Sequence, residues 1–248
     1  PHILKVEAVD KAGNVGVHTF EEVYVDTAPP EAPVIQPLAA GYRTPSITLN
    51  WSAVTDGPNT VTYEAQWDYL PTFSSTSKID MLDLTSNAWS LLTAPEGEQW
   101  FRVRTVSTVA PYEEKRSAWS QPVSTIYDTT PPTTPVLSLV SPNPTNTVPQ
   151  VWTWTSPPDA VGYKVSIDGG TWADVGDVNF YHTGFATEGD HSFAILAYDW
   201  LGNESSSVWA TVTIDTTPPA RPVAFGLDGV SPTNDNTPAW WWTHDPAT

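Results

Sequence analysis

The sequence predicts an all-β protein, a linear array of β-sandwich domains with partial domains at both ends. An eight-residue phrase, D-T-[A/T]-P-P-x-x-P, occurs three times, at residues 26–33, 128–135 and 215–222. Between the copies, apolar and polar residues alternate with a period of two, and no stretch has the periodicity of an amphipathic helix. Aromatic residues also recur at matching positions after each copy, which indicates that the intervening segments repeat one architecture.

The repeated phrase predicts stiff connectors between domains. Each copy holds three prolines, which lack a backbone donor and restrict the residue before them to extended conformations, so the phrase is neither helix nor central strand. Successive copies begin 102 and 87 residues apart. The predicted division is therefore a pair of last strands (1–26), two complete domains (33–128 and 135–215) and the first strands of a further domain (222–248).

The first segment repeats the end of the third one. Residues 1–26 overlay residues 190–215 at a constant offset of 189, which matches His2 with His191 and Asp10 with Asp199. Both copies read as an alternating stretch, a D-x-x-G-N turn and a second alternating stretch. That pattern predicts a β-hairpin, with Gly and Asn at the positive-φ positions of its loop.

The start of each unit repeats as well. A tryptophan follows the linker aspartate by 25, 26 and 27 residues, at Trp51, Trp154 and Trp242, and all three are predicted to be core residues of the second strand. A tyrosine of the next strand follows in the complete domains, at Tyr63 and Tyr163. The sequence E-G-x-x-x-F then opens the penultimate strand, at residues 96–101 and 188–193. About seven short strands per 80–95 residues are typical of a β-sandwich.

These residues resemble known families. Residues 163–172 (YKVSIDGGTW) and 197–203 (AYDWLGN), with the D-T-T-P-P linker, resemble the bacterial immunoglobulin-like repeats of large surface adhesins. The middle unit is more similar to fibronectin type III domains, through LNW at 49–51, WFRVR at 100–104 and SAWSQP at 117–122, although residues 107–115 stand where its neighbours carry D-x-x-G-N. The resemblance covers the whole chain and implies tandem sandwiches of an extracellular or cell-surface protein.

The composition limits the classes of binding partner that we expect for this chain. The net charge is −18 although only 15% of the residues are charged, an acidic balance that repels nucleic acid and anionic lipid and favours cations. There is no cysteine, which fits bacterial export better than a disulfide-rich eukaryotic module. No apolar run approaches the roughly 20 residues of a membrane span. We expect this sequence to be a segment of a longer chain, with any export signal or anchor outside the segment.

Five aspartates are candidate calcium ligands: Asp10, Asp26, Asp128, Asp199 and Asp215. In the adhesin repeats that the chain resembles, calcium ions stiffen the joints between domains, and calcium takes six to eight oxygen ligands. The loop aspartates and the linker aspartates belong to opposite poles of a unit, so such a site would combine different units. The alternative is that each aspartate caps its own turn.

The thirteen tryptophans raise glycan binding as an alternative function. Adjacent strand residues point to opposite faces, so Trp240, Trp241 and Trp242 cannot all enter one core. Exposed aromatic patches mark contact surfaces. The core leaves several tryptophans unexplained, namely Trp67, Trp172, Trp200, Trp209, Trp240 and Trp241. They could pack between units or make the chain a glycan-binding accessory module of a secreted polysaccharide-processing protein.

Catalysis finds no support in the sequence. The five histidines are scattered, and no zinc, nucleophile-elbow, dinucleotide or phosphate-loop motif is present. We therefore expect a non-catalytic stalk or spacer of an adhesin, surface layer or filament, without a catalytic residue and with calcium as the only cofactor considered. Its expected partners are neighbouring domains of the same chain or head-to-tail copies, with a surface glycan or protein as a further possibility.

Overall fold

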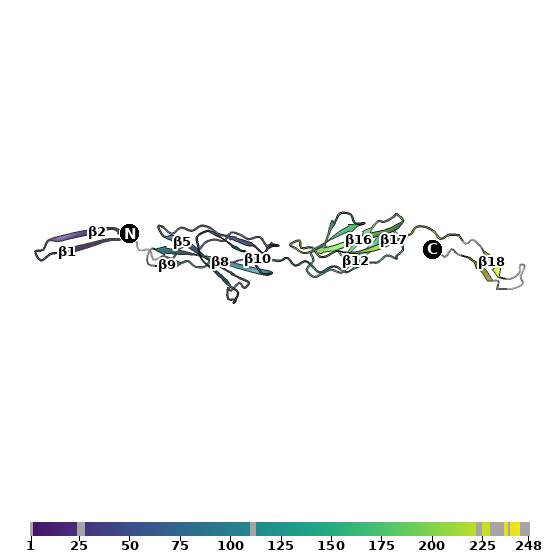
Figure 1. Cartoon of the computed structure of the whole chain (residues 1–248), viewed down its shortest axis with the longest axis horizontal. Coiled ribbons are helices and arrows are strands. Elements are labelled where there is room, and N and C mark those ends of the chain that lie inside the picture. Colours follow the sequence, from purple (N-terminus) through teal and green to yellow (C-terminus); the bar gives the residue numbers. More distant parts are fainter. Residues whose placement is uncertain are drawn as a thin grey trace. The chain divides into compact units, whose positions relative to one another are not determined.

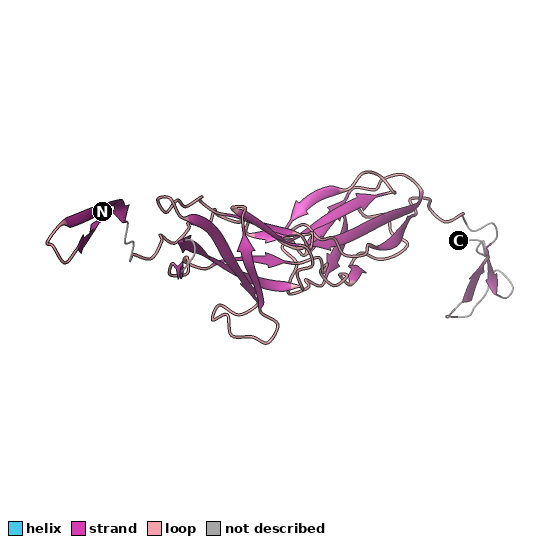
Figure 2. Ribbon diagram, turned by 60° about the vertical axis from the view of Figure 1, so that its left-hand side comes forward, coloured by secondary structure: helices cyan, strands magenta, loops and turns pink. Residues whose placement is uncertain are grey.

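The computed structural model describes residues 2–23, 28–109, 113–221, 225–228, 236–237 and 239–243, and every regular element in them is a β-strand (Figures 1 and 2). The chain divides into two compact units, Pro1–Thr129 and Thr130–Thr248. Both units contain facing sheets with buried aromatic cores, so the predicted all-β sandwich class is confirmed.

The chain begins with an antiparallel hairpin of β1 (His2–Val9) and β2 (Val15–Val23). By the internal repeat, its residues Val6 and Ala8 correspond to Ile195 and Ala197, which are fully buried in the second unit. Val6 is 49% exposed. The hairpin thus has the same alternation of apolar residues as β16 and β17, but Val6 is not buried as its counterpart Ile195 is.

The first sandwich has two sheets. The larger follows the order β3-β10-β8-β5-β6, with β9 paired to β8 beyond this path, and only the β3–β10 pairing is parallel. Its strands are β3 (Gly41–Tyr42), β5 (Thr60–Asp68), β6 (Ile79–Leu84), β8 (Gly97–Val109), β9 (Glu113–Arg116) and β10 (Val123–Tyr127). The smaller sheet pairs β4 (Ile47–Asn50) with β7 (Ala88–Leu91), and Ile35 bridges to Trp51 at its end.

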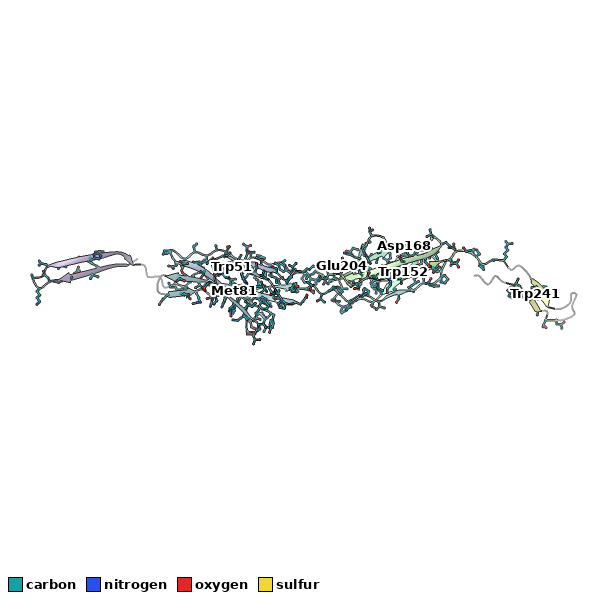
Figure 3. The ribbon with its side chains drawn as sticks, viewed as in Figure 1. Trp51, Met81, Trp152, Asp168, Glu204 and Trp241 are labelled. Atoms are coloured by element: carbon teal, nitrogen blue, oxygen red, sulfur yellow. The ribbon has the colours of Figure 1, made fainter. Side chains whose placement is uncertain are left out.

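The tryptophan predicted in the second strand and the tyrosine predicted in the next strand form the centre of this core. Trp51 is fully buried, and its ring meets that of Tyr63 edge-on, with centroids 5.4 Å apart. Figure 3 labels Trp51 in the first sandwich. Trp67, which the sequence leaves unexplained, is also a core residue, and its Nε1–H donates to Gln99 Oε1 at 2.8 Å.

The second sandwich packs a three-stranded sheet, β11-β12-β15, on a four-stranded sheet, β14-β13-β16-β17. Labelled A-B-E and C′-C-F-G, these two sheets form a seven-stranded sandwich, the architecture that immunoglobulin-like and fibronectin type III domains share. The strands are β11 (Leu137–Leu139), β12 (Gln150–Trp154), β13 (Gly162–Ile167), β14 (Ala173–Gly176), β15 (Phe180–Thr183), β16 (Gly189–Tyr198) and β17 (Val208–Ile214).

Two tryptophans of β12 fill the second core. Trp154 packs on Tyr163 with centroids 5.4 Å apart, as Trp51 does on Tyr63. Trp152 is fully buried and stacks on Phe193 at 4.9 Å, with its Nε1–H donating to Thr183 Oγ1 at 3.0 Å. Figure 3 labels Trp152 in the second sandwich. The sequence pattern predicted Trp154 but not Trp152.

The last described strands, β18 (Phe225–Asp228) and β19 (Ala239–Trp242), form a hairpin with the register of β11 and β12. Trp242 pairs with Phe225 as Trp154 pairs with Leu137. The prediction that Trp242 is a core residue is nevertheless wrong for this structure, because Trp242 is 65% exposed. Its burial requires a facing sheet, and neither core among the described residues includes β18 or β19.

Candidate functional site

The loop aspartates cap their own turns. The Asp10 carboxylate accepts bonds from the Ala12 and Asn14 N–H groups at 2.8 and 2.9 Å and from Asn14 Nδ2 at 2.7 Å. These bonds, led by the Asn14 side chain, lower the pKa of Asp10. Asp199 repeats the arrangement with Leu201 and with the N–H and Nδ2 of Asn203, at 2.8–2.9 Å. The alternative of turn-capping therefore accounts for both carboxylates.

The linker aspartates close the last strand of each sandwich. The Asp128 N–H donates to the Tyr42 carbonyl at 3.1 Å, and the Asp215 N–H donates to the Thr145 carbonyl at 3.0 Å. Asp26 lies outside the described residues. In the described part of the chain, no three His, Cys, Asp or Glu side chains come together as metal ligands. Calcium binding at the five aspartates stays a prediction.

A glutamate that the sequence did not single out binds the root of each of the last two linkers. The Glu96 carboxylate accepts from the Thr129 N–H at 3.0 and 3.2 Å and from Thr129 Oγ1. Glu188 accepts from the Thr216 N–H at 2.9 Å and from Oγ1 of Thr216 and Thr217, both at 2.6 Å. The hydroxyls of Thr216 and Thr217 and the Thr216 N–H lower the pKa of Glu188 to about 2. We call this contact the Glu–Thr latch.

The latch uses two repeated motifs that the sequence showed separately. The glutamates belong to E-G-x-x-x-F, and the threonines belong to D-T-x-P-P. Gly97 and Gly189, which follow the glutamates, have φ values of +109° and +113°, a conformation that favours glycine. The only signal in the sequence was that E-G and D-T recur together in both domains. This recurrence does not reveal that the glutamate contacts the threonine across about 30 residues of chain.

In the first sandwich, a buried glutamine holds the turn that carries the latch. Gln99 follows Glu96 by three residues, and its Nε2–H donates to the carbonyls of Pro95 and Gly97 at 2.7 and 3.0 Å. These carbonyls flank Glu96 in the chain. Because Gln99 is fully buried and bonded to Trp67, the glutamate stands on a turn tied to the core.

In the second sandwich, His191 takes the position of Gln99, three residues after Glu188. Its Nε2 lies 3.0 Å from the Thr187 carbonyl, its Nδ1 lies 2.9 Å from Asp168 Oδ2, and its ring stacks on Phe185 at 4.4 Å. The hydrogen bond to Asp168 and the one to the Thr187 carbonyl raise the pKa of His191. Both ring nitrogens face acceptors, so the imidazolium form suits this site.

The stability of the second sandwich is expected to fall as the pH rises from 6.5, the ordinary pKa of histidine, upward. The raised pKa of His191 means that its contribution is fully present below the ordinary value of 6.5 and is lost above the folded-state pKa. Melting curves of the parent and of His191→Gln across this range check the prediction. The pH dependence should shrink in His191→Gln and persist in His182→Gln, an exposed histidine of the same unit; an equal dependence in all three proteins would contradict it.

Arginines and aromatic rings form a second polar cluster, on the outer face of β5 and β8. The guanidinium carbon of Arg102 lies 4.1 Å from the Phe73 ring centroid and 4.7 Å from that of Trp119, and Arg104 lies 4.3 Å from Trp119. Burial and the neighbouring Arg104 lower the pKa of Arg102. Such cation–π contacts are stabilising when they are partly desolvated. The cluster ties the SAWSQP segment to β8.

Beside the rings, Glu64 binds two arginines. Its carboxylate accepts from Arg104 Nε at 2.6 Å and from Arg116 Nε at 2.9 Å, and its side chain is only 7% exposed. Arg116 also pairs with Glu114 at 2.8 Å. The charges of this face are therefore neutralised internally, which is the pattern of a structural network.

The remaining unexplained tryptophans are surface residues. Trp209 lies on the edge strand β17 and is 69% exposed, and Trp172, Trp200, Trp240 and Trp241 are also exposed. Trp241 lies over Gly226 of the paired strand, where a Cβ atom would come within 2.9 Å of its ring. These side chains leave aromatic surface available for contact.

Comparisons with known proteins add little. No family model matches the sequence, and no curated protein matches it. Among solved structures, the chain is similar to the FN1–FN3 domains of chicken CNTN1, at 10% identity and a TM-score of 0.40, covering 84% of this chain and 76% of that chain. None of the described residues forms a helix long and apolar enough to cross a membrane.

Proposed function

We propose that this chain is a non-catalytic spacer or stalk segment of an extracellular or cell-surface protein, such as an adhesin, a surface layer or a filament. One observation carries the proposal: both described sandwiches bind the root of the following proline linker through the same Glu–Thr latch. A fixed linker root at the end of each domain is what an extended array needs. The bacterial setting and the neighbouring domains as partners belong to the same proposal.

The surface chemistry supports this role. The net charge of −18 opposes association between copies and keeps a crowded array soluble. The polar cluster on β5 and β8 is paired internally, through the contacts of Glu64 with two arginines. The domains therefore serve to hold distance and direction.

An extended particle is the expected result of small-angle scattering on this chain. Proline linkers with fixed roots keep domains apart, so the radius of gyration should clearly exceed the ~18 Å of a compact domain of this length. Replacing Pro131 and Pro132 with glycine should broaden the distance distribution without unfolding either sandwich, because glycine restores freedom at the joint. A radius near the compact value would contradict the spacer role.

A glycan-binding accessory module is the second candidate, favoured by the exposed tryptophans. Trp209 presents a large aromatic face on an edge strand. Affinity electrophoresis in polysaccharide gels separates the two functions. Retardation that disappears in Trp209→Ala would support the glycan module, and unretarded migration across a panel of polysaccharides supports the spacer.

A further inference from the structure

We propose that the Glu–Thr latch sets the direction in which each proline linker leaves its sandwich, with Glu96 and Glu188 as the positioning residues of the joints. This inference rests on the proposed spacer function and adds the residues that perform it. The argument starts from the restraints on the linker root.

At the first joint, consecutive residues are fixed from two sides. The Asp128 N–H is bonded to the carbonyl of Tyr42 on the neighbouring strand β3, and both the N–H and the hydroxyl of Thr129 are bonded to Glu96. A single residue, Thr130, then stands before Pro131. Because a residue before proline is restricted to extended backbone, little rotation remains between the latch and the prolines.

At the second joint, the latch reaches the prolines directly. Thr217 Oγ1 donates to Glu188 at 2.6 Å, and the Thr217 N–H donates to Asp215 Oδ1 at 3.0 Å. Thr217 immediately precedes Pro218, so the last latched residue is also the first restricted by proline. The ring of proline then fixes φ near −65° and carries the direction forward.

Contacts within each sandwich fix the turns that carry Glu96 and Glu188, independently of the linker. Gln99 donates to the carbonyls on both sides of Glu96, and His191 binds Thr187, the residue before Glu188. A carboxylate on a prearranged turn loses little conformational entropy when it binds, which strengthens its hold on the threonines. The position three residues after the glutamate thus supports the latch in both sandwiches.

Backbone order parameters from ¹⁵N relaxation test the latch at the first joint. In the parent, Thr129 should be as ordered as a strand residue, near 0.85, and Glu96→Ala should lower it toward 0.6 or below. Glu96→Gln, which keeps one acceptor oxygen, should fall between them. Glu98→Ala is the matched control, since Glu98 is an exposed glutamate two residues further along the chain, in β8.

The melting temperature of the first sandwich, followed in the same samples, separates a loosened root from an unfolded domain. An unchanged order parameter at Thr129 in Glu96→Ala, or an equal loss in Glu98→Ala, would overturn the proposal. Because the measurement is local to Thr129, it stands whatever the overall dimensions of the particle. Compact scattering with a latched Thr129 would reject the spacer role alone.

Discussion

Replacing Trp152 with alanine is expected to lower the free energy of unfolding of the second sandwich by about 3–5 kcal/mol. The side chain is fully buried and stacked on Phe193, so its removal leaves a large cavity. It also removes the Nε1–H donor to Thr183, whose hydroxyl is bonded in turn to the buried Gln150. With total stabilities of about 5–15 kcal/mol for such domains, this is a large fraction.

Denaturant unfolding of the parent, of Trp152→Ala and of Trp209→Ala measures the effect of Trp152. The second variant removes the same ring from an exposed strand position of the same unit, and surface changes of this kind stay within about 0.5 kcal/mol. Equal losses in the two variants would show that the stacked core described around Trp152 does not hold the fold together.

Replacing Glu64 with alanine is expected to destabilise the first sandwich by about 3 kcal/mol, the lower end of the range for a broken buried ion pair. Its carboxylate is the shared partner of Arg104 and Arg116, and its loss leaves two guanidinium groups close together against β5 and β8. The arginines are partly exposed, so water compensates some of the loss.

The control for Glu64 is Glu114→Ala. Glu114 also pairs with Arg116, but its side chain is 51% exposed, and exposed pairs contribute about 0–1 kcal/mol. Chemical unfolding of both variants at low and at high salt completes the test. A loss in Glu64→Ala no greater than that in Glu114→Ala would refute the structural importance of this carboxylate.

Local patterns predicted most of the fold. Alternation and turn residues gave the strands, and the offset of 189 residues gave the equivalence of the first hairpin with β16 and β17. Spacing also identified Trp51 and Trp154 as core residues. The failure at Trp242 has a physical reason, because the face on which a strand residue points follows from local pattern, whereas burial depends on what packs against that face.

The Glu–Thr latch could not be predicted from the sequence, because it also depends on which segments meet in the folded domain. Glu96 and Thr129 are 33 residues apart, and their contact depends on the antiparallel pairing of β8 with β10, which places Gly97 opposite Tyr127. Sequence reasoning assigned the linker aspartates to the joint because carboxylates near prolines suggest cations or caps. It did not anticipate that a glutamate from the body of the domain would bind the linker threonines.

The position three residues after the latch glutamate is an exchangeable part of the joint. With glutamine there, the support contains no group that titrates near neutrality; with histidine, the same support carries a proton that the surroundings can remove. The support of the second joint therefore contains a titratable group, bonded to Asp168 and to the Thr187 carbonyl, that the support of the first joint lacks. In a chain built from such domains, joints that depend on pH can therefore alternate with joints that do not, while the sandwiches between them keep the same fold.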